Sequence, residues 1–187
     1  MSSSSPVDQL GRALDATGAV ITGVRSDQWS NPTPCPEWNV RTLVNHLVGG
    51  NQMFAAILRG EPPPQGNVDH LGDDPVAAHR KAGAALQAAF SQPAIFERVF
   101  RVPAGTVPGA VALHLRITEL LVHGWDLARA TGQRPDFDPE AVQAGLQFAQ
   151  ANMTGERTGE FPFAPVVEAA PAAPEVDKLA AFMGRQV

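Results

Sequence analysis

Two ionisable residues in an otherwise apolar segment are the first candidates for chemistry. Residues 111–130 read VALHLRITELLVHGWDLARA, and their many aliphatic side chains predict a helix with little polar face. Glu119 and His123 lie four residues apart, which places their side chains about 40° apart around a helix axis and one turn from each other. A carboxylate inside an apolar bundle needs a cation, hydrogen bonds or water beside it, because an unpaired buried charge is unfavourable. A divalent metal would satisfy both residues.

A third candidate comes from an earlier segment of the chain. His46, in the sequence NHLVGG, lies at the edge of the apolar stripe of a second predicted helix. Gly49 and Gly50 follow it, and each glycine disfavours a helix by roughly 1 kcal/mol relative to alanine, so we expect a neighbouring helix or a ligand to come close there. With Glu119 and His123, His46 gives the two-histidine, one-carboxylate composition of catalytic zinc sites and of some iron sites, with coordination positions left open.

The same residues also have a simpler interpretation. Glutamate and histidine four residues apart occur often on helices by chance, and a buried pair can hydrogen-bond without any metal. An isolated histidine such as His46 on a helix edge is commonly a core residue whose hydrogen bonds are satisfied by the protein. The spacing alone leaves both interpretations open.

Three residues near these candidates have roles that the sequence leaves open. Asp126 lies two turns from Glu119 and about 20° away around the axis, so it could accept the N–H of a ligand histidine. It could equally pair with Arg129 or Arg116, or form a hydrogen bond near the helix end. Arg116 could pair with the ligand carboxylate, although we expect a solvated arginine. Cys35, between two prolines, is expected to be a small packed side chain of a loop.

The remaining histidines and two tryptophans are expected to have structural roles. His70, His79 and His114 have no partner at ligand spacing on their own helix faces, so we expect surface or core residues. Trp38 and Trp125 are expected to pack in the core or to form a pocket wall.

Proline, glycine and capping residues mark where helices begin and end. Predicted helices start at Ser5-Pro6, Asn39, Asp74-Pro75, Pro108-Gly109 and Asp138-Pro139; the first four end near Val24, Gly60, Phe90 and Ala130, and a short terminal helix covers 177–183. Gly132 stands where a left-handed C-cap residue is expected. Segments 95–102 and 164–170 could be extended. The predicted fold class is all-α, a four-helix bundle with short extra helices and a minor extended segment.

Length and composition narrow the class of protein further. The 187 residues, 44% of them hydrophobic, predict one domain over residues 1–187. A net charge of -5 without a basic block disfavours nucleic acid as a partner. A single cysteine allows no internal disulfide and suits a reducing compartment. No stretch approaches the ~20 apolar residues that span a bilayer, and residues 1–5 do not resemble a leader, so we expect a cytoplasmic protein without a membrane partner.

Three motifs in this order resemble the DinB-like metalloenzyme superfamily. They read TPCPEWNVR at 33–41, NHLVGG at 45–50 and LVHGWDLA at 121–128. Within the superfamily, the chain is similar to the single-domain group related to the metal-binding N-terminal domain of mycothiol-dependent maleylpyruvate isomerase, from high-GC Gram-positive bacteria. The resemblance covers most of the chain and includes the tail from Phe161 to Arg185.

The resemblance implies a four-helix bundle in which a histidine of the second helix and a pair four residues apart on a later helix hold a divalent metal. Those positions are His46, Glu119 and His123 in this chain. Many relatives use three histidines, whereas a glutamate in this position agrees with the isomerase-like version of the site. Zinc is the expected ion, with nickel, manganese and iron as alternatives.

The resemblance also implies an activity. Characterised relatives are transferases and isomerases that use a low-molecular-weight thiol such as mycothiol, and a metal-bound thiol loses its proton near neutral pH to become a nucleophile. We therefore expect a thiol-dependent transferase or isomerase that takes a thiol and an electrophilic small molecule as partners and that could form a homodimer. The separate C-terminal domain of the isomerase has no counterpart here, so maleylpyruvate is not the predicted substrate. A non-catalytic protein that binds a metal, a thiol or another small ligand is the alternative, and a metal-free structural bundle is a third.

Overall fold

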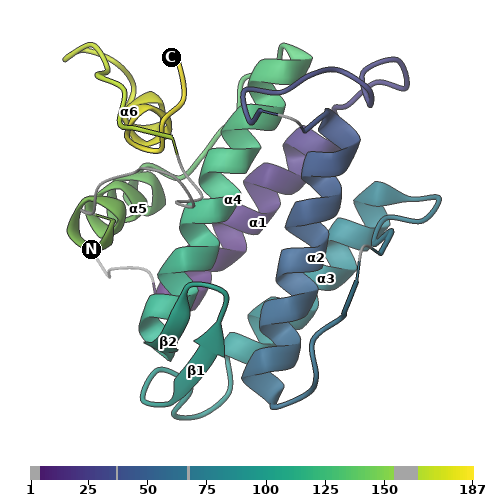
Figure 1. Cartoon of the computed structure of the whole chain (residues 1–187), viewed down its shortest axis with the longest axis vertical. Helices are drawn as coiled ribbons and strands as arrows, with labels where there is room; N and C mark the ends of the chain where they lie inside the picture. Colours follow the sequence, from purple (N-terminus) through teal and green to yellow (C-terminus); the bar gives the residue numbers. More distant parts are fainter. Residues whose placement is uncertain (1–4, 37, 67, 154–163) are drawn as a thin grey trace.

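The computed structural model describes residues 5–36, 38–66, 68–153 and 164–187, and the first three residues of the tail motif lie outside them. Its helices are α1 (Pro6–Thr22), α2 (Val40–Arg59), α3 (Pro75–Phe90), α4 (Gly109–Thr131), α5 (Pro139–Asn152) and α6 (Glu175–Phe182), and its strands are β1 (Val99–Val102) and β2 (Gly105–Pro108). Figure 1 shows α1 to α4 side by side as a bundle. The predicted all-α class, with short extra helices and a minor extended segment, is confirmed.

Polar caps fix most helix ends where the sequence predicts them. At the start of α1, α2, α3 and α5 a cap side chain accepts a hydrogen bond from a backbone N–H in the first turn, which satisfies a donor without a helical partner. These caps are Ser5, Asn39, Asp74 and Asp138. Gly60 and Gly132 end α2 and α4 in the left-handed conformation, at φ angles of 75° and 69°.

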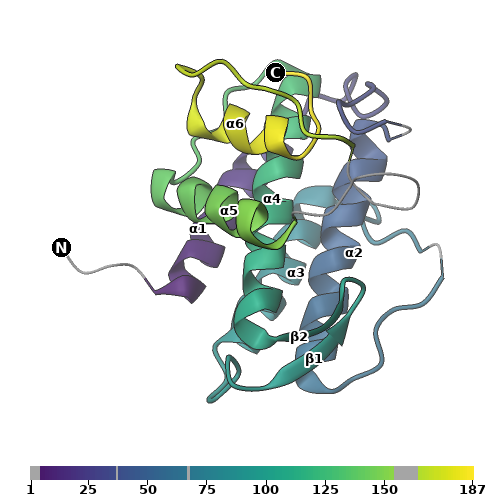
Figure 2. The ribbon, with the colours of Figure 1, turned by 60° about the vertical axis from the view of Figure 1, so that its left-hand side comes forward.

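Helix α4 is the central element, as its nearly all-apolar sequence predicts. It contacts α1, α2, α5 and α6, and Figure 2 shows α5 and α6 lying across it. The Thr17 hydroxyl of α1 donates to the Leu120 carbonyl 3.0 Å away. This buried polar group between α1 and α4 therefore has its hydrogen-bond partner within the protein. Although α4 is long and buried, no helix in the described ranges is apolar and long enough to cross a membrane.

The extended segments differ from the sequence-based expectation. Only residues 99–102 of the predicted segment 95–102 form a strand, because the preceding residues make turns. The strand pairs antiparallel with Gly105–Pro108, a partner that we did not predict, in a register that sets Val99 opposite Pro108. Segment 164–170, which the sequence suggested could be extended, belongs to no strand. It lies along α6 instead, where the Val167 N–H donates to the Ala181 carbonyl.

The two glycines of α2 stand where other side chains come close, as the sequence suggested. A Cβ atom at Gly49 would lie 2.7 Å from Cδ2 of His70, and one at Gly50 would lie 2.7 Å from Nη1 of Arg116. Both distances are shorter than real Cβ contacts allow. The missing side chain at Gly50 therefore leaves space for a buried guanidinium group between α2 and α4.

We expect Gly50→Ala to lower the free energy of unfolding by about 1–3 kcal/mol, because the new methyl group displaces the buried Arg116 guanidinium. Urea denaturation followed by circular dichroism measures this. Gly11→Ala in α1 is the matched control, since its Cβ would meet only the terminal amide of Gln87, which ends a partly exposed, flexible side chain. The control should lose no stability, and equal losses in both variants would contradict the role assigned to Gly50.

Candidate metal centre

Helices α2 and α4 bring the three predicted ligands together. Nε2 of His46 lies 3.0 Å from Oε2 of Glu119, and Nε2 of His123 lies 3.8 Å from the same oxygen. One ligand atom from each residue lies within 4.8 Å of the other two. Zinc–nitrogen and zinc–oxygen bonds of about 2.0–2.2 Å separate ligand atoms by up to about 4 Å, so small side-chain shifts would suit an ion. The donor set of two imidazoles and one carboxylate fits a divalent metal.

The three side chains differ in their access to solvent. The His123 side chain is 5% exposed, that of Glu119 is 24% exposed and that of His46 is 36% exposed. The His123 side of the cluster is therefore closed by protein. A small molecule would reach the cluster from the side of His46.

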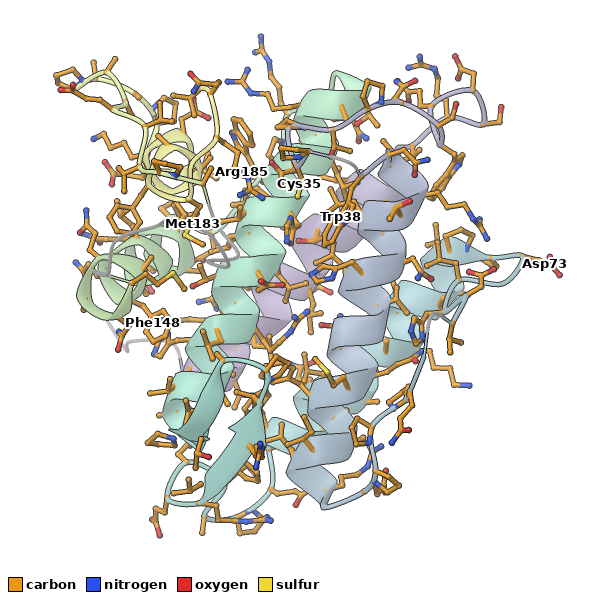
Figure 3. All side chains as sticks on the ribbon, viewed as in Figure 1. Cys35, Trp38, Asp73, Phe148, Met183 and Arg185 are labelled. Atoms are coloured by element: carbon orange, nitrogen blue, oxygen red, sulfur yellow. The ribbon has the colours of Figure 1, made fainter. Side chains whose placement is uncertain are left out.

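Trp38 forms a wall beside the two histidines. Its ring centroid lies 4.5 Å from that of His46 and 5.8 Å from that of His123, and the two imidazoles meet edge to face at 5.2 Å. Figure 3 shows Trp38, from the loop before α2, lying between α2 and α4. Trp38 also packs against the hydrophobic core, so the structure supports the packing role expected for it.

Asp126 contacts the other nitrogen of His123. Its Oδ2 lies 3.0 Å from Nδ1 of His123, while Arg185 binds both carboxylate oxygens, from Nε to Oδ1 at 3.2 Å and from Nη2 to Oδ2 at 2.9 Å. Burial raises the pKa of Asp126, but the hydrogen bonds from His123 and Arg185 outweigh it and the pKa is lowered. An ionised Asp126 accepts the Nδ1–H of His123, which leaves Nε2 as the free ligand nitrogen.

Arg116 is buried, and the expectation of a solvated arginine is wrong. The residue is 2% exposed, its Nη2 donates to Oδ1 of Asn51 at 2.8 Å, and its Nη1 lies 3.5 Å from Oε2 of Glu119. Its face of α4 packs against α2, where Gly50 leaves room and the Phe54 ring lies 5.2 Å from the guanidinium carbon. The buried cation lies between helices because α4 has little surface outside the core.

Glu119 is held in its ionised form. Burial raises its pKa, but the hydrogen bond with His46 and the positive charges around it, including that of Arg116, hold the pKa well below its ordinary value. A carboxylate that is already ionised needs no proton release to bind a cation.

Cys35 lies beside this cluster without being a ligand in our interpretation. Its sulfur and ligand atoms of His123 and Asp126 lie within 4.8 Å of one another, but Asp126 is already engaged by His123 and Arg185. Burial raises the pKa of the Cys35 thiol, which favours the neutral form over the thiolate that binds metals. These surroundings agree with a packed loop residue.

The other histidines lie apart from the cluster, in the structural roles expected for them. Nε2 of His79 is 3.0 Å from the Leu14 carbonyl, Nδ1 of His70 is 2.9 Å from Oε1 of Gln52, and the His114 ring stacks on Phe148. Sequence reasoning missed Asn51 and Arg185, which both contact residues of the site. Neither stands at a spacing from Glu119 or His123 that could have identified it.

A double-mutant cycle tests the buried Arg116–Asn51 contact. We expect Arg116→Met to cost about 1–3 kcal/mol of unfolding free energy, because it leaves the Asn51 amide oxygen buried without its partner. Asn51→Leu in the Arg116→Met background should recover part of the loss, because both ends of the contact are then apolar. Chemical denaturation of the four proteins gives the coupling energy, and strictly additive effects would show that the contact contributes nothing.

Comparisons with known proteins identify the family of this chain and proteins similar to it. Residues 10–128 match the family described as mycothiol maleylpyruvate isomerase N-terminal domain. Uncharacterized protein MT0763 and Uncharacterized protein Rv0738, from two strains of Mycobacterium tuberculosis (CDC 1551 / Oshkosh and ATCC 25618 / H37Rv), are each 41% identical to it over 177 residues, which is 94% of this chain and 95% of the relative.

Two crystal structures of the mycothiol-dependent maleylpyruvate isomerase, one of them of a mutant, share the fold. Their TM-scores are 0.63 and 0.65 at 15% sequence identity, over 82% of this chain and 70% of the isomerase chain. The matched segment 10–128 contains His46, Glu119 and His123, whereas Arg185 lies beyond it. The DinB-like resemblance of the motifs is thereby confirmed, and the chain belongs to the mycothiol maleylpyruvate isomerase N-terminal domain family.

Proposed function

We propose that this protein holds one divalent metal ion with His46, Glu119 and His123 and uses it to activate a low-molecular-weight thiol of the mycothiol type. The thiol then attacks an electrophilic small molecule, in a transfer or an isomerisation. The convergence of the three ligand atoms within 4.8 Å of one another carries the proposal, and membership of a family named after a mycothiol-dependent isomerase supports it. Zinc suits the mixed nitrogen and oxygen ligands, and nickel, manganese and iron are alternatives.

The charges around the site favour an anionic ligand such as a thiolate. Each carboxylate has its own guanidinium group, Glu119 with Arg116 and Asp126 with Arg185, so these four side chains cancel in charge. These four side chains would therefore leave the positive charge of a divalent ion held there uncompensated. A bound metal of this kind lowers the pKa of a coordinated thiol, so that the thiolate is present at neutral pH.

The surroundings give the protein's own side chains distinct roles. Asp126 orients His123, Trp38 offers an apolar surface to an electrophile and displaces water from one side, and the exposed edge of His46 leaves a path for the thiol. Arg116 holds Glu119 from the side opposite to solvent.

A non-catalytic binding protein is the second candidate, and one observation favours it. Two surface hollows of about 470 and 410 Å³ lie elsewhere, one beside α2 and the proline-rich loop that follows it, the other between α1 and α3, and neither is lined by a residue of the site. Both volumes fall in the range of small-molecule sites, and a ligand held in either hollow would lie apart from the metal and would not react there.

Metal analysis tests the ligand assignment. Protein purified without chelators should carry about one divalent ion per chain by mass spectrometry, and His46→Ala and His123→Ala should lose it because two remaining ligands bind weakly. His114→Ala is the matched control, because His114 lies on the same helix α4 but stacks on Phe148 away from the site. Equal metal content in all four proteins would remove the assignment.

A thiol conjugation assay separates the enzyme from the binding protein. The zinc-loaded chain, given mycothiol and an activated aryl halide, should form the thioether faster than the uncatalysed reaction, and His123→Ala should abolish the gain. Calorimetric titration with mycothiol alone measures binding. Mycothiol binding without turnover of any electrophile would favour the second candidate.

A further inference from the structure

A residue of the C-terminal tail contacts the site from outside the matched family segment. Arg185 follows α6, is 6% exposed, and binds both carboxylate oxygens of Asp126 on α4. In Figure 3, Arg185 lies beside α4 next to Cys35, at the end of the bundle away from the β1–β2 hairpin. A long, charged side chain at the end of a chain is rarely buried unless it has a partner, so the contact holds the tail in place.

The tail is shaped so that Arg185 can reach Asp126. Gly184 adopts a left-handed φ of 85°, which turns the chain directly after α6, and the Arg185 backbone N–H donates to the Ala180 carbonyl. Nη1 of Arg185 donates to the Met183 carbonyl at 2.9 Å, which fixes the guanidinium group relative to its own backbone. The other two nitrogens of the guanidinium group, Nε and Nη2, both donate to Asp126. Among the described residues, Asp126 is the acceptor that binds these two nitrogens.

A second anchor joins the same tail to the neighbouring residue of α4. Nε1 of Trp125 donates to Oδ1 of Asp177, in α6, at 2.7 Å. This contact holds α6 against α4 but does not touch Asp126 or His123. Among the described residues, two side chains of the tail, Asp177 and Arg185, therefore form hydrogen bonds with side chains of α4. Of these two, only Arg185 binds a residue that contacts the candidate ligand His123.

We propose that Arg185 is a positioning residue of the metal centre: it fixes Asp126, which in turn fixes the His123 imidazole so that Nε2 points toward His46 and Glu119. The inference rests on the proposed function, because it takes His123 to be a metal ligand. Asp126 has no solvent-exposed surface on its side chain. Without the guanidinium group, the buried carboxylate would keep His123 as its one hydrogen-bond partner among the described residues. Rotation of the carboxylate toward water then releases the imidazole.

The contact also couples the tail to the metal. If docking of Arg185 favours the imidazole orientation that binds an ion, then ion binding must favour docking of Arg185 by the same factor, because linked equilibria are reciprocal. Metal binding on α2 and α4 should therefore protect residues 180–187, although none of them is a ligand.

The test compares Arg185→Met, Arg185→Lys and the matched control Asp177→Ala with the wild type, all full-length and metal-free at the start. Competition with a chromophoric chelator should show about 10–100-fold weaker zinc binding for Arg185→Met, as expected for loss of support behind a ligand histidine, and a partial recovery for Arg185→Lys. Asp177→Ala loosens the other tail anchor and should keep wild-type zinc affinity. Circular dichroism melts show whether each variant is folded.

Two further readouts report on positioning itself. Nitrogen NMR of the metal-free proteins should show the Nδ1–H tautomer of His123 dominant in the wild type and in Asp177→Ala but mixed with the other tautomer in Arg185→Met. Hydrogen exchange of residues 180–187 should slow on zinc addition in the wild type and not in Arg185→Met. Wild-type zinc affinity and tautomer in Arg185→Met would overturn this inference alone, whereas a wild-type chain that binds no zinc would overturn the proposed function.

Discussion

A single carboxylate oxygen inside a nearly apolar bundle is the point on which this structure depends. Oε2 of Glu119 lies 3.0 Å from Nε2 of His46, 3.5 Å from Nη1 of Arg116 and 3.8 Å from Nε2 of His123. Side chains from two helices, α2 and α4, therefore surround this one oxygen atom. A charge in such surroundings is tolerated only if partners surround it. The packing of α2 against α4, down to the missing side chain at Gly50, provides those partners.

The same rule applies two turns further along α4, at Asp126, and extends to Arg185 near the end of the sequence. Asp126 is buried between His123 and Arg185, so each of the two histidines faces an ionised carboxylate that has its own arginine. Paired in this way, the two carboxylates and two guanidinium groups cancel in charge before any ligand enters. In the function that we propose, a divalent cation held there would keep its charge and attract an anionic ligand.

The family relationship agrees with this arrangement of residues. The segment that matches the mycothiol maleylpyruvate isomerase N-terminal domain family contains all three candidate ligands, and the crystal structures of the isomerase have the same fold at 15% identity. At that identity only the backbone arrangement carries over. The α6 segment and Arg185 lie beyond the residues that match the family.

The sequence by itself determined where α1 to α5 begin, approximately where α1 to α4 end, and that Glu119 and His123 share one face. Caps, prolines and a spacing of four residues act locally along the chain. Only the tertiary structure decided that Arg116 is buried, that Arg185 reaches Asp126, and that residues 99–102 pair with 105–108 while 164–170 lies along α6. The physical reason is that these outcomes depend on which surfaces meet in space, and contacts between residues 59 positions apart, such as Arg185 with Asp126, leave no periodic pattern in the sequence.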